Sequence, residues 1–226
     1  MTRPARLLAA AACAALLTAC STTEPVPDWK TNALASIERA TENHLQGKTR
    51  QAEREWRKAR QDISASGRLD LLARLELNAC AARTAGLDFG ECSAFAPLAE
   101  DAGDDDRAYA RYLAAALQEG DASLLPAAHQ GAAAAIAAAT PEAAEQAAAA
   151  IADPYARLIA AAVLLHAGLG SDALAQLAAD TASAQGWRRP LLAWLQLLTR
   201  SHNADTAALA ARRIKMMERE GAPAEE

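Results

Sequence analysis

Cysteine and histidine are the residues of this chain whose side chains could act as nucleophiles, redox groups or metal ligands. No histidine pair has the HxxxH or HExxH spacing of a helical metal site, and neither GxSxG nor CxxC occurs. The sequence therefore predicts no catalytic residue, no metal and no cofactor. The chemistry that remains is that of the four cysteines, at positions 13, 20, 80 and 92.

The first nineteen residues have the three-part layout of a secretory signal peptide. Two arginines precede an apolar run over residues 7–17, which is shorter than the roughly 20 apolar residues of a spanning helix. The tetrad Leu17-Thr18-Ala19-Cys20 resembles the lipobox of bacterial lipoproteins. This resemblance implies cleavage before Cys20, a diacylglyceryl thioether on its sulfur and acylation of the new amino terminus. Ser21 at the next position implies sorting to the outer membrane, with the protein facing the periplasm.

The mature chain is thus expected to attach to the membrane through the lipid on Cys20 without spanning it. Several acyl chains, at about 0.8 kcal/mol per buried methylene group, hold a protein to a bilayer durably. Residues 20–28 then form the lipidated cysteine and a short tether, residues 29–220 one helical domain, and residues 221–226 a frayed tail. The alternative is an ordinary cleaved signal peptide in which Cys20 is incidental.

Cys80 and Cys92 are the two thiols left after Cys13 departs with the signal and Cys20 takes the lipid. An oxidising compartment favours the pairing of such thiols. The segment between them has the pattern of a helix that stops at Gly86 and a chain that turns back. We therefore predict a disulfide that staples this loop onto the preceding helix. Two buried reduced thiols or a redox pair are the alternatives.

The charge balance argues against a nucleic-acid partner. The formal net charge of −5 includes Arg3 and Arg6, and without them 21 basic and 28 acidic side chains leave −7. Such a chain has no basic surplus with which to neutralise phosphates. Gly47-Lys48-Thr49 ends like a phosphate-binding loop, but Glu42 stands where that motif has its first glycine.

The densest run of charge covers residues 100–106 and contains no EF-hand ligand spacing. We expect Asp104 to Asp106 to cap and fill the first turn of a helix that carries Tyr109 and Tyr112, because the helix dipole favours acidic groups there. A docking site for a basic peptide is the alternative.

The composition predicts an all-α fold. The chain has 64 alanines and 29 leucines but only 2 valines, 6 isoleucines, 2 phenylalanines and 3 tyrosines. Alanine and leucine favour helices, whereas sheet cores need β-branched and aromatic side chains. Regularly placed glycines and prolines divide the chain into about ten helices joined by short turns.

Several single residues carry expectations of their own. Trp56, Trp187 and Trp194 are the best candidates for core anchors. His166 lies in an apolar segment, where a core position is expected. Arg188 and Arg189 stand at a helix start, which is unfavourable for cations, so they are expected to seek an acidic group outside the chain.

One spacing recurs along the chain. Gly47 is followed at fixed intervals by Ala52, Trp56 and Ala59, and Gly168 is followed in the same way by Ala173 and Leu177. This spacing resembles the tetratricopeptide repeat, in which a glycine ends the first helix and small and bulky residues pack along the second. The resemblance implies a right-handed αα-hairpin solenoid. The alternative is a non-repetitive helical bundle.

These features together favour a non-catalytic scaffold or adaptor in an envelope assembly, secretion or pilus-type complex. Its partners would be the membrane, through Cys20, and an envelope protein or peptide. The alternative is a periplasmic protein that binds a ligand or lipid or acts on the cell wall. An open groove lined by polar and aromatic side chains would favour the scaffold, and a closed deep pocket would favour the alternative.

Overall fold

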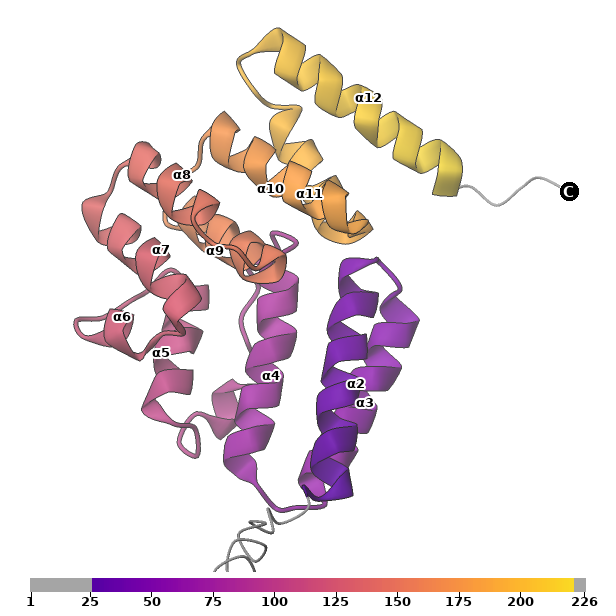
Figure 1. Ribbon diagram of the computed structural model, residues 1–226, viewed down its shortest axis with the longest axis vertical. Coiled ribbons are helices and arrows are strands. Elements are labelled where there is room, and N and C mark those ends of the chain that lie inside the picture. Colours follow the sequence, from indigo (N-terminus) through magenta and orange to yellow (C-terminus); the bar gives the residue numbers. More distant parts are fainter. Residues whose placement is uncertain (1–25, 222–226) are drawn as a thin grey trace, which may run out of the picture.

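The computed structural model of the protein describes residues 26–221. The expected signal peptide, the lipid-bearing Cys20 and residues 222–226 lie outside the described residues. The described part contains no strand, which confirms the predicted all-α class (Figure 1). Its helices are α2 (Asp28–Leu45), α3 (Thr49–Ser64), α4 (Leu69–Thr84), the short 3-10 helix η1 (Ala96–Leu98), α5 (Asp104–Leu113), α6 (Asp121–Leu124), α7 (Ala127–Ala138), α8 (Pro141–Ala149), α9 (Pro154–His166), α10 (Asp172–Gln185), α11 (Arg188–Leu198) and α12 (Ala204–Gly221).

Local sequence signals set the starts of the central helices. The side chains of Thr140, Asp153 and Ser171 each accept a hydrogen bond from the backbone N–H three residues further on. Such caps satisfy amide groups that the first turn of a helix leaves without partners. Pro141 and Pro154 follow two of these caps at the first helical position, where a missing N–H costs nothing.

The first two helices form an antiparallel hairpin. Gly47 turns the chain between α2 and α3 with a φ of +83°, a left-handed conformation that favours glycine. Ala52, Trp56 and Ala59 are buried on α3 in a small core shared with α2 and α4. The four residues of the first repeat-like spacing thus occupy one turn and one packed helix face.

Helix α9 lies at the centre of the main core. Every side chain of residues 158–164 is buried, and the helix contacts α4, α5, α7, α8 and α10. Because the helix is rich in alanine and short aliphatic residues, neighbouring helices can approach it closely on several sides. Trp194 on α11 and Tyr112 on α5 are the largest fully buried side chains of this core.

Helix α11 joins the late part of the chain to the first hairpin. The Trp187 indole donates a hydrogen bond to Glu42 Oε2 at 2.9 Å. The Arg189 guanidinium donates to the carbonyl oxygen of His44 at 2.8 Å and to Thr49 Oγ1 at 2.7 Å. The expectation that Arg189 seeks an acidic group outside the chain is therefore wrong. It binds the carboxyl-terminal end of α2, where carbonyl groups and the helix dipole favour a cation.

The sulfur atoms of Cys80 and Cys92 lie at disulfide-bonding distance, as predicted, and their Cα atoms are 5.6 Å apart. This bond fastens the loop after α4 to the last turn of that helix. Phe89 in the loop stacks on His166 at a ring-centroid distance of 4.4 Å. His166 itself is exposed, so the expected core position is wrong, because this residue ends α9 where the chain reaches the surface. The buried histidine is His129.

Removal of the disulfide is expected to cost about 3 kcal/mol of unfolding free energy. The Cys80→Ser/Cys92→Ser double variant keeps the helices. It loses the cross-link between two residues 12 positions apart, so the unfolded chain gains conformational entropy. Urea unfolding followed by circular dichroism measures the loss. The oxidised chain treated with a thiol reductant should match the variant, and an unchanged unfolding midpoint in both samples would show that the bond stabilises nothing.

Candidate functional site

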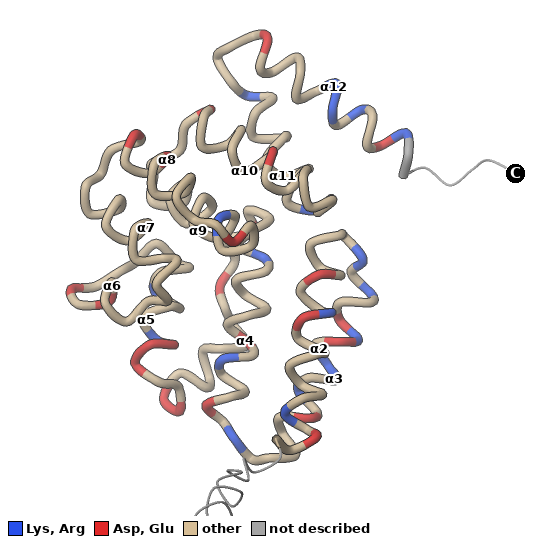
Figure 2. Tube along the Cα trace, viewed as in Figure 1, with Lys and Arg blue, Asp and Glu red and all other residues tan. Residues whose placement is uncertain are grey.

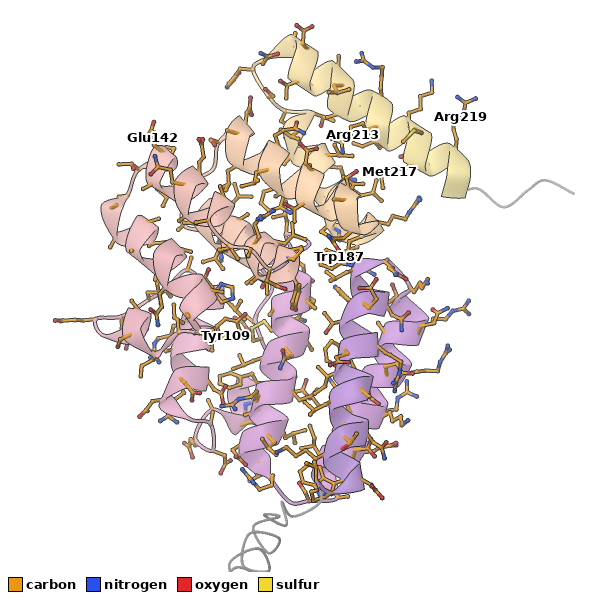
Figure 3. The ribbon with its side chains drawn as sticks, viewed as in Figure 1. Tyr109, Glu142, Trp187, Arg213, Met217 and Arg219 are labelled. Carbon is orange, nitrogen blue, oxygen red and sulfur yellow. A yellow bond between two sulfur atoms is a disulfide. The ribbon has the colours of Figure 1, made fainter. Side chains whose placement is uncertain are left out.

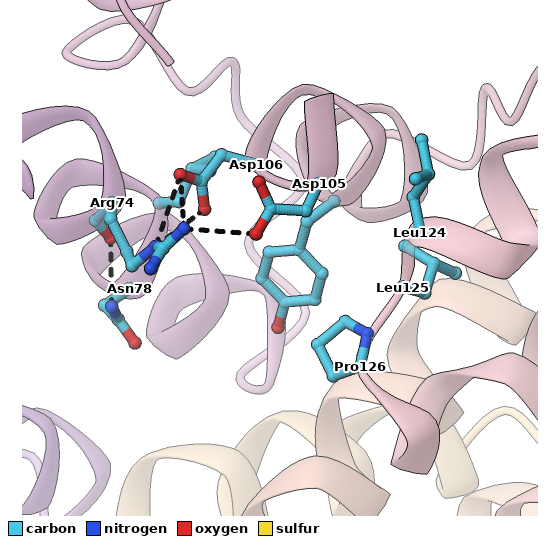
Figure 4. A pocket seen from close by; sticks show the side chains of 9 residues that line it. Arg74, Asn78, Asp105, Asp106, Leu124, Leu125 and Pro126 are labelled. Carbon is cyan, nitrogen blue, oxygen red and sulfur yellow. Dashed lines mark hydrogen bonds and ion pairs between the residues drawn. The ribbon is translucent and has the colours of Figure 1, made fainter. Parts of the chain in front are cut away.

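An open groove lies between α4, α5 and the segment that joins α6 to α7, and Figure 4 shows it from close by. We call it the acidic groove. Its hollow measures about 420 Å³. The residues that line it are Arg74, Leu77 and Asn78 of α4, Asp105, Asp106 and Tyr109 of α5, and Leu124, Leu125 and Pro126.

An ion-pair network forms one wall of the acidic groove. Arg74 Nε lies 3.0 and 3.2 Å from the two carboxylate oxygens of Asp106, and Arg74 Nη2 lies 3.1 Å from Asp105 Oδ2 (Figure 4). Asn78 Nδ2 donates to the Arg74 carbonyl oxygen at 2.9 Å. The hydrogen bonds to Asp106 raise the pKa of the Arg74 guanidinium above its ordinary value. One cation therefore meets two carboxylates, which leaves a surplus negative charge.

The two carboxylates of this wall have different environments. The Asp106 side chain is only 10% exposed, whereas that of Asp105 is 56% exposed. Asp106 thus serves mainly to tie α5 to α4, and Asp105 keeps a carboxylate that can meet a ligand. Figure 2 shows the acidic residues gathered at the start of α5.

Asp104 to Asp106 occupy the first turn of α5, as predicted, but none of them caps it. The N-cap residue is Gly103, and no side chain donates or accepts a capping bond there. A Cβ atom on Gly103 would lie 2.3 Å from Asp105 Oδ1, so a larger residue there would require the exposed Asp105 carboxylate to move. The aspartates instead pair with arginines, Asp104 with Arg107 on the same helix and the others across the groove wall.

Apolar side chains form the opposite wall. Pro126 and Leu124, which is 42% exposed, face the hollow from the segment between α6 and α7, and the buried Leu77 lies on the α4 side. Tyr109 lies between the two walls, and Figure 3 shows it on α5. Burial raises the pKa of its phenol above the ordinary value of 10. The hydroxyl therefore stays protonated and keeps its ability to donate a hydrogen bond near neutral pH.

A second ion pair positions the loop that carries the apolar wall. Asp121, at the start of α6, accepts hydrogen bonds from Arg111 Nε at 2.7 Å and from the Gln118 backbone N–H at 2.8 Å. The bond to Arg111 lowers the pKa of this carboxyl to about 2. Asp121 stays charged under any ordinary condition, so α6 remains fastened to α5 and Leu124 keeps its place in the groove.

A second hollow, of about 240 Å³, lies between α3, α4, the disulfide loop and Arg189. It brings together five residues that the sequence singled out, Ala52, Trp56, Cys80, Cys92 and Arg189. Its arginines already hold the fold together: Arg60 pairs with the buried Glu76 at 2.5 Å, and Arg83 donates to the Glu91 carbonyl oxygen at 3.1 Å.

A buried aromatic cluster lies beside the acidic groove. Tyr112 Oη is 3.2 Å from His129 Nδ1, and the rings of Tyr109 and His129 have centroids 5.5 Å apart. Burial lowers the pKa of His129 from 6.5 to about 4, so its imidazole is neutral near pH 7. The cluster braces α5 against α7 and so supports the groove floor from behind.

Sequence reasoning missed both this cluster and the pairing of Arg74 with Asp106. The two partners of the ion pair are 32 residues apart, and no local spacing marks Arg74. The acidic run over residues 100–106 is the one sequence feature that points to this groove, through its alternative interpretation as a docking site for a basic peptide.

Histidine, cysteine and carboxylate side chains do not gather in groups of three or more that could hold a metal ion anywhere in residues 26–221. No helix between Asp28 and Gly221 combines the length and hydropathy that a membrane crossing requires. Compared as a whole, the chain matches no family model, no curated protein and no solved structure.

Proposed function

We propose that this protein is a non-catalytic interaction scaffold, held at the outer membrane by lipid on Cys20 and facing the periplasm, that serves an envelope assembly, secretion or pilus-type complex. The observation that carries the proposal is the acidic groove, an open hollow with a surplus carboxylate on one wall and leucines on the other. Open grooves of this kind bind protein segments through a few anchoring side chains.

The ligand of the acidic groove would be a protein segment with one apolar and one basic side chain. The apolar side chain would lie against Leu124 and Pro126, where it removes exposed apolar surface from water. A lysine or arginine would reach Asp105, which Arg74 neutralises only in part. Because Asp105 is largely exposed, we assign its ion pair to orientation and the apolar contact to affinity.

The finer description of the fold belongs to this proposal as well. We infer that the first hairpin is a tetratricopeptide-like unit, which the left-handed Gly47 turn and the buried Ala52, Trp56 and Ala59 support. Contacts between α4 and α9 and between α2 and α11 join helices far apart in sequence. They favour an array that curls back on itself over a fully open solenoid, whose repeats contact only their neighbours.

A second candidate function is the binding of a small anionic ligand in the second hollow. His44 Nε2 and Arg83 Nε are buried there without a hydrogen-bond partner. Burial, with Arg189 and Arg83 nearby, lowers the pKa of His44 to about 4. An anion would compensate this local positive charge. A ligand of this kind would fit the alternative of a periplasmic protein that binds a ligand or lipid or acts on the cell wall.

Photo-crosslinking in living cells tests the scaffold. A photoreactive amino acid at Leu124, inside the acidic groove, should give one defined protein adduct, and the same group at the exposed Leu34 on α2 should not. Asp105→Lys in the Leu124 chain should reduce the adduct about tenfold, because the basic side chain of the partner then meets a cation. Glu119→Lys makes the same charge change at an exposed position outside the groove and should leave the adduct intact.

The anchor is tested in the same cells. Cys20→Ser should move the protein from the membrane fraction to the periplasmic fraction and weaken the adduct, because the local concentration at the membrane is lost. Equal adducts from Leu124 and Leu34, or an adduct that ignores Asp105→Lys, would exclude the acidic groove as the binding surface. Failure of Cys20→Ser to change the fractionation would exclude the lipid anchor.

A further inference from the structure

Helix α12 presents two different faces. Its inner face packs on α11 through Ala210, Ile214 and Met217, and Arg213 Nη1 reaches Asp180 of α10 at 3.3 Å. Figure 3 shows Arg213 and Met217 directed toward the body of the protein and Arg219 directed away from it. The inner face therefore accounts for the docking of α12 and leaves the outer face to be explained.

The outer face of α12 combines exposed apolar and basic side chains. Leu209 is 45% exposed and Met216 is 62% exposed, and their spacing of seven residues places them on the same side of the helix. Arg212, Lys215 and Arg219 flank them, are exposed, and make no ion pair within the described residues. We call these five residues the basic stripe. A shallow hollow of about 470 Å³ lies among its last four residues.

The basic stripe departs from the usual pattern of a surface helix, whose exposed side is polar. Helix α12 packs on α11 through its inner side, and its outer side is exposed to solvent. Here two large apolar side chains lie in that position. The stripe is also basic in a chain with an acidic surplus, and Figure 2 shows its blue segments along α12. Both features are those of a surface that a partner covers.

We propose that the basic stripe docks an acidic segment of a protein partner. Carboxylates of the partner would face Arg212, Lys215 and Arg219, and its apolar side chains would cover Leu209 and Met216. The protein would then carry two interaction surfaces of opposite charge, the acidic groove and the basic stripe. A scaffold with two such surfaces can hold two different partners at once.

Two other occupants fit the stripe less well. A second copy paired through the same helix about a twofold axis would place its cations against those of the first copy, which is repulsive. A membrane surface is disfavoured because α12 lies at the end of the long axis opposite the start of α2 (Figure 1). This last step rests on the proposed anchor at Cys20, which would place the start of α2 nearest the bilayer.

Fluorescence anisotropy with a synthetic amphipathic peptide tests the proposal. The peptide carries leucines along one helical face and glutamates beside them, and a reference peptide has lysine in place of each glutamate. Residues 21–226 contain the whole described fold and are used without lipid, so the outcome does not depend on the anchor. We expect the acidic peptide alone to bind, with an affinity about tenfold lower at 0.3 M salt than at 0.05 M.

A matched pair of variants locates the binding surface. Replacement of Arg212, Lys215 and Arg219 by glutamate should abolish binding. Replacement of Arg50, Arg54 and Arg57 by glutamate changes the charge equally on the exposed face of α3, which lacks large apolar residues, and should leave the affinity within about twofold. Thermal unfolding of both variants confirms that they fold.

Three results would overturn the proposal. The first is absence of binding by the acidic peptide. The second is an equal loss of binding in both triple variants, which would indicate attraction to net charge alone. The third is a stripe-dependent interaction with another occupant, seen as binding to phosphatidylglycerol vesicles or as a dimer in sedimentation without peptide. None of these results bears on crosslinking at Leu124, so the acidic groove is tested separately.

Discussion

Trp194→Ala is expected to lower the free energy of unfolding by about 3–5 kcal/mol, the largest effect of any single substitution considered for this protein. Trp194 is fully buried on α11. Its indole donates a hydrogen bond to the Ala85 carbonyl oxygen at 3.3 Å, just beyond the end of α4. Truncation removes a large apolar side chain, leaves a cavity and strands a buried carbonyl group. Since small domains are stable by about 5–15 kcal/mol, the loss is a large share of the total.

Urea unfolding followed by circular dichroism measures this effect, and two variants separate its causes. Trp194→Phe keeps most of the apolar ring and removes only the N–H donor, so it should cost about 1–2 kcal/mol. Trp29→Ala truncates a half-buried tryptophan at the start of α2 and should cost less than Trp194→Ala. A loss below 1 kcal/mol for Trp194→Ala would show that α11 does not hold the late helices to α4.

The sequence predicts features of this fold that depend on neighbouring residues. Helix formation by alanine and leucine, the turn at Gly47, and the first-turn position of Asp104 to Asp106 all follow from local rules. Trp56 and Trp194 are buried, as predicted, because large apolar side chains are more stable in a protein core than in water. The approach of Cys80 to Cys92 belongs to the same group, since only one short loop separates them.

Features that depend on the path of the whole chain could not be predicted. Arg189 meets His44 across 145 residues, and only the packing of α11 against α2 brings them together. His166 and His129 both lie in helices rich in alanine, yet only His129 faces the core, because the position of each within its helix decides its burial. The acidic groove has the same origin, since Arg74 and Asp106 meet only after α5 docks on α4.

Acid is expected to destabilise the protein through His129 at a pH well above the range in which carboxylates protonate. Burial lowers the pKa of this histidine to about 4, against about 6.5 in the unfolded chain. Between these values the unfolded state binds the extra proton, so the unfolding free energy falls as the pH falls. From pH 7.5 to 5.0 this histidine alone should remove about 2 kcal/mol. Asp121, whose pKa is lowered to about 2, weakens the fold only below its ordinary value of 3.8.

Urea unfolding at the two pH values isolates this contribution with the variant His129→Asn. The asparagine amide can still pair with the Tyr112 hydroxyl but does not titrate, so the loss between pH 7.5 and 5.0 should shrink by about 2 kcal/mol. A smaller loss should remain, because the half-buried His44 also has a pKa lowered to about 4. His166→Asn replaces an exposed imidazole and should keep the full loss. If His129→Asn also kept the full loss of unfolding free energy between pH 7.5 and 5.0, His129 would have to be charged or exposed in the folded protein. The aromatic cluster behind the acidic groove would then be open to water, and the groove would lose the rigid floor on which its proposed binding role depends.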